Sequence, residues 1–369
     1  MKSSVFSSRI DKIMEILKEK EIDAFLVTPS SDMKYLCGYV IPGDERFLAL
    51  VLAPDHEPFI IANILYELQV TETPVEEYAY WFDGSDPFAL LKEEMKKRGI
   101  RSKKVAVDSA MPALFTIGIM EHFPDAALVN GSPYIQALRI YKDRTELNAM
   151  FEASRRADYC LGKMIARGRE WLGKKETDFQ AALIYEMTCN DMKGSGALVA
   201  AGAGAAVPHH HSNANLIQDN SCLLIDFGGS YRNYSSDMTR TYHFGKPSDK
   251  FRDVYNIVLE ANLAGEEAAK AGNELQAVDR AARAVIAKYG YGDYFIHRTG
   301  HGIGIDCHEG PSAGEGETLE IRPGMCFSCE PGIYLPGEFG IRIEDLVAID
   351  LDGSTKVLNH LSKELTVIE

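Results

Sequence analysis

Short apolar runs alternate with helical periodicity as far as residue 130. The runs at 24–28, 47–53, 58–62, 104–108 and 126–129 predict strands, and the segments near 10–20, 86–98 and 112–122 predict helices. This alternation is typical of a small α/β domain. The run Asn130-Gly131-Ser132-Pro133 consists of turn-forming residues, so it predicts where that domain gives way to the next.

The rest of the chain reads twice as two helices followed by strands. Helical patterns at about 143–171 and from about 177 precede strands that begin at Ala197. A second pair of helical patterns, at about 249–271 and 274–288, precedes further strands. The repeated order indicates an internal duplication about a pseudo-twofold axis. We therefore expect a larger α+β domain to follow the small α/β one.

Two aspartates occupy the first group of strands. Asp226 follows the apolar run 222–225, and Asp237 lies in the next strand-like run, 234–242. Between them, 228–233 has the composition of a turn. Because the midpoint of the two aspartates falls inside this turn, we expect a hairpin that places them directly opposite each other, with Cβ atoms ~5 Å apart.

Two glutamates repeat this arrangement in the second group of strands. Glu330 and Glu344 flank a turn at Pro336-Gly337-Glu338, so they too are expected to face each other. Like charges held this close repel each other. A bound metal is the simplest way to make both pairs tolerable, whereas an isolated surface acid would simply be solvated.

Histidines and glycines lie between the two acidic pairs. His297, His301 and His308 fall within twelve residues, and glycines flank His301 on both sides. The glycines disfavour a helix and allow the backbone to approach a ligand closely. A further run of three histidines follows a proline, and we select its first member, His209, as a candidate site residue.

Together the four acids and one histidine form a hard, oxygen-rich donor set. Such a set suits manganese, cobalt or iron and also accommodates zinc, and two divalent ions would balance four carboxylates. Arg342 lies two residues from Glu344, hence on the same strand face, where its charge could orient a substrate carboxylate. The alternative for Arg342 is a solvent-exposed position on an edge strand. The candidate metal ligands are Asp226, Asp237, His301, Glu330 and Glu344.

Composition excludes several classes of partner. The net charge of −15 and the pI near 5.2 disfavour binding to nucleic acid and to anionic membranes. The apolar run 47–53 is too short to span a bilayer, and no secretory signal is evident. Seven scattered cysteines fit a reducing cytosol, so we expect a cytoplasmic protein. We interpret Cys326 and Cys329 as core residues, because no second pair completes a zinc site.

Around these residues the chain closely resembles the pita-bread metallopeptidases, the family of prolidase, Xaa-Pro aminopeptidase and methionine aminopeptidase. Residues 1–137 resemble the creatinase/prolidase N-terminal domain, which leaves 138–369 as the catalytic domain. The extra domain and the short gap between the two glutamates resemble the proline-specific branch. The matching stretches are Asp226-Phe-Gly-Gly, Tyr234-Ser-Ser-Asp237-Met-Thr-Arg, Gly300-His301-Gly-Ile-Gly, Glu330-Pro-Gly-Ile-Tyr and Ile341-Arg-Ile-Glu344-Asp.

The resemblance implies hydrolysis of the Xaa-Pro bond at the N-terminus of dipeptides or short peptides. It implies a homodimeric enzyme with two divalent ions, most simply manganese. In this reading Asp226 and Glu344 bridge the ions, Asp237 binds one of them, and His301 and Glu330 bind the other.

The same resemblance assigns the remaining polar groups. Glu330 would also accept the proton of the attacking water. His209 and His308 would steady the developing oxyanion and the departing proline nitrogen, and His297 would line the proline pocket.

Three alternatives stay open. The first is an Xaa-Pro aminopeptidase acting on longer peptides, since Ser312 stands where some prolidases carry an arginine associated with the substrate carboxylate. The second is a non-peptide hydrolase or lyase on the same scaffold. The third is a catalytically silent peptide-binding relative, against which the complete ligand set argues.

Overall fold

The computed structural model describes residues 4–39 and 42–369 and separates into two compact units, Met1–Arg139 and Ile140–Glu369. The expected boundary between 137 and 138 falls two residues before this division. Each unit has its own sheets and its own buried apolar residues.

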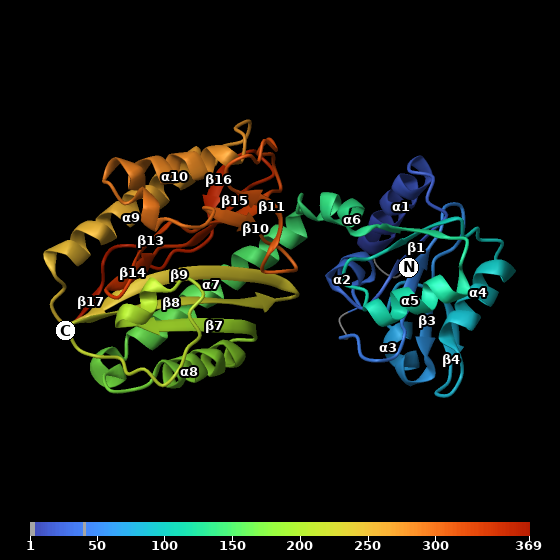
Figure 1. The fold of residues 1–369 in the computed structure, drawn as a ribbon, viewed down its shortest axis with the longest axis horizontal. Coiled ribbons are helices and arrows are strands. Elements are labelled where there is room, and N and C mark those ends of the chain that lie inside the picture. Colours follow the sequence, from blue (N-terminus) through green and yellow to red (C-terminus); the bar gives the residue numbers. More distant parts are fainter. Residues whose placement is uncertain (1–3, 40–41) are drawn as a thin grey trace. The chain divides into compact units, whose positions relative to one another are not determined.

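The N-terminal unit is a mixed six-stranded sheet, in the order β4-β3-β2-β1-β5-β6, accompanied by helices (Figure 1). Its strands are β1 (Ala24–Val27), β2 (Ala49–Leu52), β3 (Phe59–Asn63), β4 (Glu77–Trp81), β5 (Lys104–Val107) and β6 (Ala127–Asn130). Its helices are α1 (Ser4–Glu19), α2 (Ser31–Cys37), α3 (Glu67–Thr71), α4 (Pro87–Lys97), α5 (Ala113–His122) and α6 (Ser132–Arg139), with a 3₁₀ turn η1 (Ile64–Tyr66). The sequence patterns found five of these strands but missed β4, α2, α3 and α6.

The missed elements carry weak local signals. Strand β4 is the edge strand of its sheet and is only partly buried, so polar and apolar residues mix along it. Helices α2 and α3 span 7 and 5 residues, which is too short to establish a helical period. Helix α6 begins inside the turn-like run at 130–133, where we expected the boundary between the two domains to begin.

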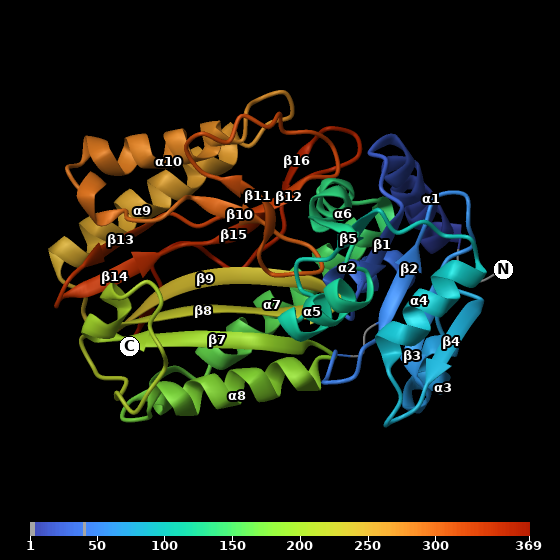
Figure 2. The ribbon, with the colours of Figure 1, turned by 45° about the vertical axis from the view of Figure 1, so that its right-hand side comes forward.

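The C-terminal unit places helices on both sides of its strands (Figures 1 and 2). Its helices are α7 (Arg144–Ile165), α8 (Glu176–Cys189), α9 (Asp249–Ala268) and α10 (Gln276–Lys288), with 3₁₀ turns η2 (Gly168–Trp171), η3 (Gly202–Ala206) and η4 (Gly292–Tyr294). One sheet has the order β17-β9-β8-β7 and another the order β11-β10-β12-β15-β16, while β13 and β14 form a separate hairpin. The strands are β7 (Lys193–Ala201), β8 (Ser221–Tyr231), β9 (Tyr234–Phe244), β10 (Gly300–Gly302), β11 (Glu309–Ala313), β12 (Cys326–Cys329), β13 (Gly332–Leu335), β14 (Phe339–Arg342), β15 (Asp345–Ile349), β16 (Thr355–Val357) and β17 (Val367–Ile368).

Helix α7 opens the C-terminal unit and has a clear start and end. Its first turn is closed by a capping box, in which Asp143 accepts from the Glu146 backbone N–H at 2.9 Å and Glu146 accepts from the Asp143 backbone N–H at 2.7 Å. We expected one helix as far as 171, but α7 ends at Ile165. Gly168 then adopts a φ of 57°, a left-handed conformation that glycine takes without strain and that starts the η2 turn.

Alternate residues of β8 point to opposite sides of its sheet and meet different partners. Leu223, Ile225 and Phe227 pack with residues of α7 and α8. Residues 222 and 224 pack instead with residues of α9, β13 and β14. Asp226 continues this second series, so strand alternation places its carboxylate on the face turned toward the β13–β14 hairpin.

The β8–β9 hairpin exists, but its register differs from our expectation. Asp226 pairs with Thr239, and Asp237 pairs with Gly228, so the two aspartates are diagonal neighbours rather than directly opposed. The reason is a two-residue loop at Arg232 and Asn233, whose φ values of 49° and 69° match a turn that needs left-handed backbone at both positions. This loop shifts the pairing by two residues and leaves both carboxylates on the same face.

The two glutamates lie opposite each other, as the sequence predicts. Cys329 pairs with Asp345 on one side of them, and Gly332 pairs with Arg342 on the other, so the same register places Glu330 across from Glu344. An isolated bridge joins Glu344 to Thr239 of β9, with the Glu344 N–H donating to the Thr239 carbonyl at 3.1 Å. This bridge brings the glutamates of one hairpin to the aspartates of the other.

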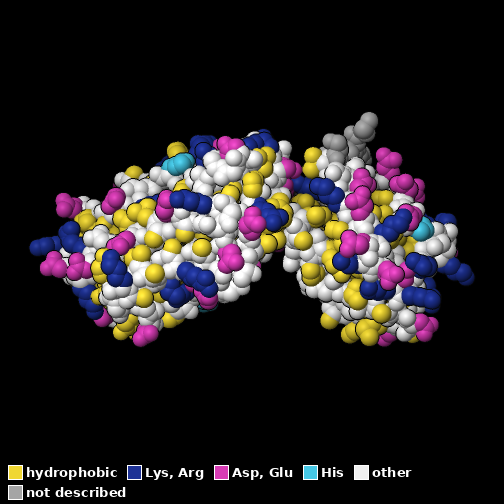
Figure 3. Space-filling view, turned by 90° about the horizontal axis from the view of Figure 1, so that it is seen from above, with side chains coloured by type: hydrophobic (Ala, Val, Ile, Leu, Met, Phe, Trp, Pro, Cys, Tyr) yellow, Lys and Arg dark blue, Asp and Glu magenta, His cyan; other side chains and the backbone are white. Residues whose placement is uncertain are grey.

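The two cysteines of the C-x-x-C run and the surface charges are placed as in an ordinary folded domain. Cys326 and Cys329 are buried in two different apolar clusters, on opposite faces of β12, which fits a packing role. Within 4–39 and 42–369, no helix is long and apolar enough to cross a membrane. On the face drawn in Figure 3, acidic and basic side chains are interspersed.

Candidate metal centre

One cavity of about 460 Å³ collects the residues that the sequence singled out. It lies within the C-terminal unit, on the face of β8 and β9 that is turned away from α7 and α8. Among the residues that line it are Asp226, Asp237, His301, Glu330, Glu344, His209, His297, His308 and Arg342. Every candidate site residue of the sequence analysis therefore faces a single space.

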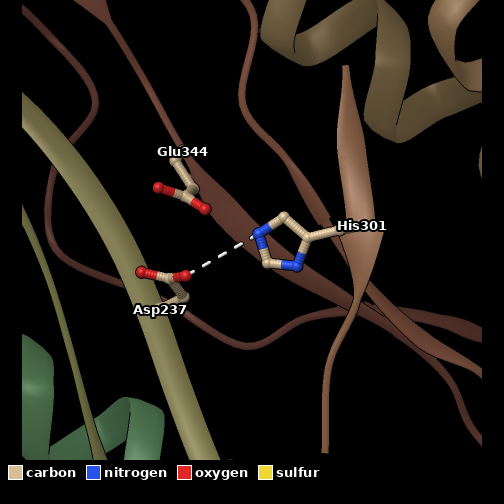
Figure 4. Close-up of side chains that lie close together, drawn as sticks. All are labelled: Asp237, His301 and Glu344. Atoms are coloured by element: carbon tan, nitrogen blue, oxygen red, sulfur yellow. Dashed lines mark ion pairs between the residues drawn. The ribbon is translucent and has the colours of Figure 1, made fainter. Parts of the chain in front are cut away.

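The tightest group in this cavity consists of Asp237, His301 and Glu344. One ligand atom from each lies within 4.8 Å of the others, and all three side chains are buried. Figure 4 shows them pointing toward one another from β9, β10 and the residue that precedes β15. The His301 Nε2 atom is 3.8 Å from Asp237 Oδ2 and 3.3 Å from Glu330 Oε1, so a further carboxylate borders the same nitrogen.

The hydrogen bonds of His301 leave one ring nitrogen available for a metal. Its Nδ1 lies 3.0 Å from the Gly302 carbonyl oxygen, which can only accept, so Nδ1 carries the proton. The lone pair is then on Nε2, the atom that faces the carboxylates. The backbone N–H of His301 donates to Ser328 Oγ at 3.0 Å, and Ser328 in turn donates to Glu330 at 3.1 Å. This arrangement holds the imidazole and Glu330 in position.

Arg342 is buried at the centre of a hydrogen-bond network rather than exposed on an edge strand. Its guanidinium donates to Asp226 through Nη2, to Thr239 Oγ1 at 3.1 Å, and to the Tyr334 hydroxyl at 2.8 Å. The Thr239 hydroxyl extends this network, because it donates a hydrogen bond to the Glu344 carboxylate at 2.7 Å. Arg342 therefore fixes two of the acids, one directly and one through a hydroxyl.

Sequence reasoning missed Thr239, Tyr334, Cys307 and Arg298. Thr239 could have been found from strand alternation, because it lies two residues after Asp237 and hence on the same face. Tyr334 accepts from Arg342 and donates to His297 Nε2 at 2.8 Å, a pairing that no local pattern announces. Cys307 lines the cavity and donates its thiol to Asp237 at 2.9 Å, again without a local signal.

The structure separates the three consecutive histidines. His209 lines the cavity. His210 instead bonds through Nε2 to Glu176 at 2.8 Å, a contact at the start of α8. On the other side of the cavity the ring of His308 lies 3.9 Å from that of His301, centroid to centroid. His209 and His308 are thus both exposed enough to meet a substrate.

The electrostatics of the cavity fit a group of metal ligands. Burial, together with the nearby carboxylates, raises the pKa of Asp237 and Glu344 well above the usual range. Burial likewise raises the pKa of Glu330 to about 7. Burial lowers the pKa of His301 to about 4, so this imidazole is neutral at pH 7 and ready to bind a metal. The surplus negative charge of four carboxylates around one buried guanidinium is what two divalent ions would neutralise.

Metal binding is expected to release protons at neutral pH. Carboxyl groups whose pKa is raised hold protons in the metal-free protein, and a metal must displace them, whereas His301 has none to lose. Apparent affinity should therefore fall as pH is lowered through 7, by about tenfold per pH unit for each proton displaced. Calorimetric titration with Mn²⁺ in two buffers of different ionisation enthalpy measures this proton count.

The same titration on Glu330→Gln provides the control. This variant should release fewer protons than the wild-type protein, because the amide that replaces the carboxyl group has no proton for a metal to displace. A wild-type binding enthalpy that is the same in both buffers would show that the carboxylates are already ionised and would contradict the account.

Fold and donor set together define a metal-dependent hydrolase, and comparison with known proteins gives its family. The model of metallopeptidase family M24 matches residues 148–350, and the model of the creatinase/prolidase N-terminal domain matches residues 9–141. The chain belongs to metallopeptidase family M24, whose members use a dinuclear divalent metal site. Its C-terminal unit has the pita-bread fold of that family, as the resemblance implied.

Similar proteins cover nearly the whole chain. An Xaa-Pro dipeptidase from Lactobacillus delbrueckii subsp. lactis is 34% identical over 363 residues, which span 97% of this chain and 98% of that protein. The crystal structure of a prolidase from Thermococcus sibiricus has a TM-score of 0.93 at 34% identity and covers 99% of this chain and 100% of that one. The structure of an X-Pro aminopeptidase from Thermotoga maritima has a TM-score of 0.81 at 29% identity, with coverage of 95% and 99%.

Proposed function

We propose that this metallopeptidase is an Xaa-Pro dipeptidase, which hydrolyses the imide bond of dipeptides that end in proline. The observation that carries the proposal is the convergence of the five candidate ligands and three histidines on one cavity. The relatives with 34% identity over nearly the full chain are named Xaa-Pro dipeptidase and prolidase, which supports this substrate class over other peptides. An X-Pro aminopeptidase at 29% identity and a prolidase at 28% are equally distant, so the proposal relies on the relatives at 34%.

We propose a revised division of the ligands between two ions. Asp237 and Glu344 would be placed to contact both ions, because one oxygen of each lies within 4.8 Å of the other and of a His301 ring nitrogen. Asp226 is diagonal to Asp237 and is held by Arg342, so it suits one ion alone. His301 and Glu330 would hold the second ion. The oxygen-rich donor set favours manganese.

Two divalent ions held by these residues would lower the pKa of water toward neutrality and polarise the scissile carbonyl. Glu330, whose Oε1 lies 3.3 Å from His301 Nε2, would accept the proton of the attacking water. His308 and His209 stand at the cavity wall, where their imidazoles would hydrogen-bond the carbonyl oxygen and protonate the departing proline nitrogen.

His297 lines the same cavity in a neutral form that suits an apolar ring. Burial lowers the pKa of His297 to about 4, and its Nδ1 donates to the Arg298 carbonyl at 2.7 Å. Tyr334 donates to the remaining nitrogen. With both nitrogens satisfied, the ring presents its face, and we propose that it packs against the proline of the substrate.

We also propose a cellular compartment and an oligomeric state for the enzyme. All seven cysteines are free, including the exposed Cys189, which supports the proposal of a reducing, cytoplasmic compartment. The family resemblance supports a homodimer.

Initial rates on Ala-Pro and Ala-Pro-Pro test the dipeptidase assignment. The manganese-loaded protein should cleave Ala-Pro with a kcat/KM at least ~10-fold higher than that for Ala-Pro-Pro, because a dipeptide presents a charged carboxylate where the tripeptide presents a neutral amide. Ala-Ala serves as the control for proline and should be a poor substrate. Preference for Ala-Pro-Pro would make the enzyme an aminopeptidase, and cleavage of neither peptide would make it a silent relative.

A further inference from the structure

The cavity contains a second arginine, Arg298, whose guanidinium forms no ion pair with the residues that the structure describes. Arg298 lines the cavity with Arg342. Arg342 already donates from all three of its guanidinium nitrogens, whereas Arg298 makes one side-chain hydrogen bond to the residues that the structure describes, from Nη1 to Ser312 Oγ at 3.3 Å. Over the described ranges 4–39 and 42–369, Arg298 has no carboxylate within ion-pair distance. A guanidinium that lines a cavity without a carboxylate partner can bind an anionic ligand.

Strand pairing places this cation next to the metal ligands. Ser312 of β11 pairs directly with His301 of β10, so its hydroxyl shares the cavity face of the imidazole. By bonding that hydroxyl, Arg298 is held close to His301. The electrostatics agree with this position: burial lowers the pKa of His308, and the positive charge of Arg298 lowers it further.

An Xaa-Pro dipeptide needs such a group. Its carboxylate lies only one residue beyond the scissile bond, so binding carries a negative charge into a cavity that already holds four acidic side chains. An arginine can pair with that carboxylate through two parallel hydrogen bonds. A longer peptide presents a neutral amide at the same place and gains no such pair.

We propose that Arg298 binds the C-terminal carboxylate of the substrate and so determines the preference for dipeptides, with Ser312 holding its guanidinium in place. The proposal rests on the proposed dipeptidase function. It gives Ser312 a positioning role, because an uncharged hydroxyl cannot itself neutralise a carboxylate.

The test compares Ala-Pro with Ala-prolinamide, which has the same scissile bond but no carboxylate. The wild-type protein should prefer Ala-Pro. In Arg298→Ala, kcat/KM for Ala-Pro should fall by ~10- to 100-fold, mainly through a higher KM, while the rate on Ala-prolinamide changes little. Arg298→Ala should therefore lose most of the preference for Ala-Pro over Ala-prolinamide. Arg298→Lys keeps the positive charge but cannot form two parallel hydrogen bonds, so it should restore part of that preference.

Arg322→Ala is the matched control, because Arg322 is an exposed arginine of the same unit that pairs with Glu320 at 3.2 Å. This variant should retain the wild-type preference. If Arg298→Ala keeps that preference unchanged while the enzyme cleaves Ala-Pro, Arg298 does not bind the substrate carboxylate, and the proposed dipeptidase function stands. If the wild-type enzyme cleaves Ala-Pro and Ala-prolinamide equally well, the proposed role of Arg298 is also overturned. If manganese-loaded wild-type protein cleaves neither compound, the proposed function fails, and the role of Arg298 fails with it.

Discussion

Asp237→Asn is expected to lose bound metal and to reduce turnover of Ala-Pro by ~1000-fold, since metal ions supply several kcal/mol of transition-state stabilisation and each 1.4 kcal/mol is a factor of ten. Asp237, His301 and Glu344 form one compact group of candidate ligands, so a neutral amide at 237 would remove one candidate ligand oxygen and one charge. The substitution preserves the shape of the side chain and its place in β9. Elemental analysis after dialysis, alongside Ala-Pro hydrolysis, measures both effects.

Asp253→Asn is the matched control for this variant. Asp253 is an exposed aspartate on α9, outside the cavity, so its replacement should leave metal content and turnover at wild-type levels. An Asp237→Asn protein that retains two ions per chain would remove Asp237 from the ligand set. Loss of metal in the control as well would indicate a general effect of the substitutions on the fold.

His308→Ala is expected to lower kcat by ~100-fold or more while metal content stays unchanged, which is the typical effect of removing a positioned proton donor or hydrogen-bond donor. His308 lies against His301 without sharing the compact ligand group. Burial lowers its pKa, so the side chain is mostly neutral at pH 7 and can exchange a proton with the reacting groups. Steady-state kinetics with parallel metal analysis separates catalysis from binding.

His360→Ala, which replaces an exposed histidine outside the cavity, should behave as the wild-type protein does. Near-normal kcat in His308→Ala would remove His308 from the mechanism. A His308→Ala protein that loses its metal would instead assign this imidazole to the metal site.

Apolar patterns in the sequence were enough to predict the two strands that carry Asp226 and Asp237, but not the register between those strands. The pairing of β8 with β9 depends on a two-residue loop, and nothing in the composition of 228–233 fixes where a turn of that size falls. Moving the turn centre by a single residue shifts the partner of Asp226 from Asp237 to Thr239. The error altered the roles expected of the two aspartates, although both remain on the cavity face.

Long-range contacts account for what the sequence left out. Strand alternation correctly linked Arg342 with Glu344, because both lie on one short segment. The partner that holds the guanidinium, Asp226, is 116 residues away and becomes its neighbour only when the two hairpins meet. Arg298 was overlooked for the same reason: its neighbourhood depends on the pairing of β10 with β11.

The central claim is that two metal ions in this cavity make the protein an Xaa-Pro dipeptidase. The most direct test titrates metal-free protein with Mn²⁺ while recording the release of proline from Ala-Pro. We expect turnover to rise with the metal and to reach its plateau at two ions per chain. Turnover that does not respond to metal, or the absence of proline release from protein that has bound two ions, would contradict the account.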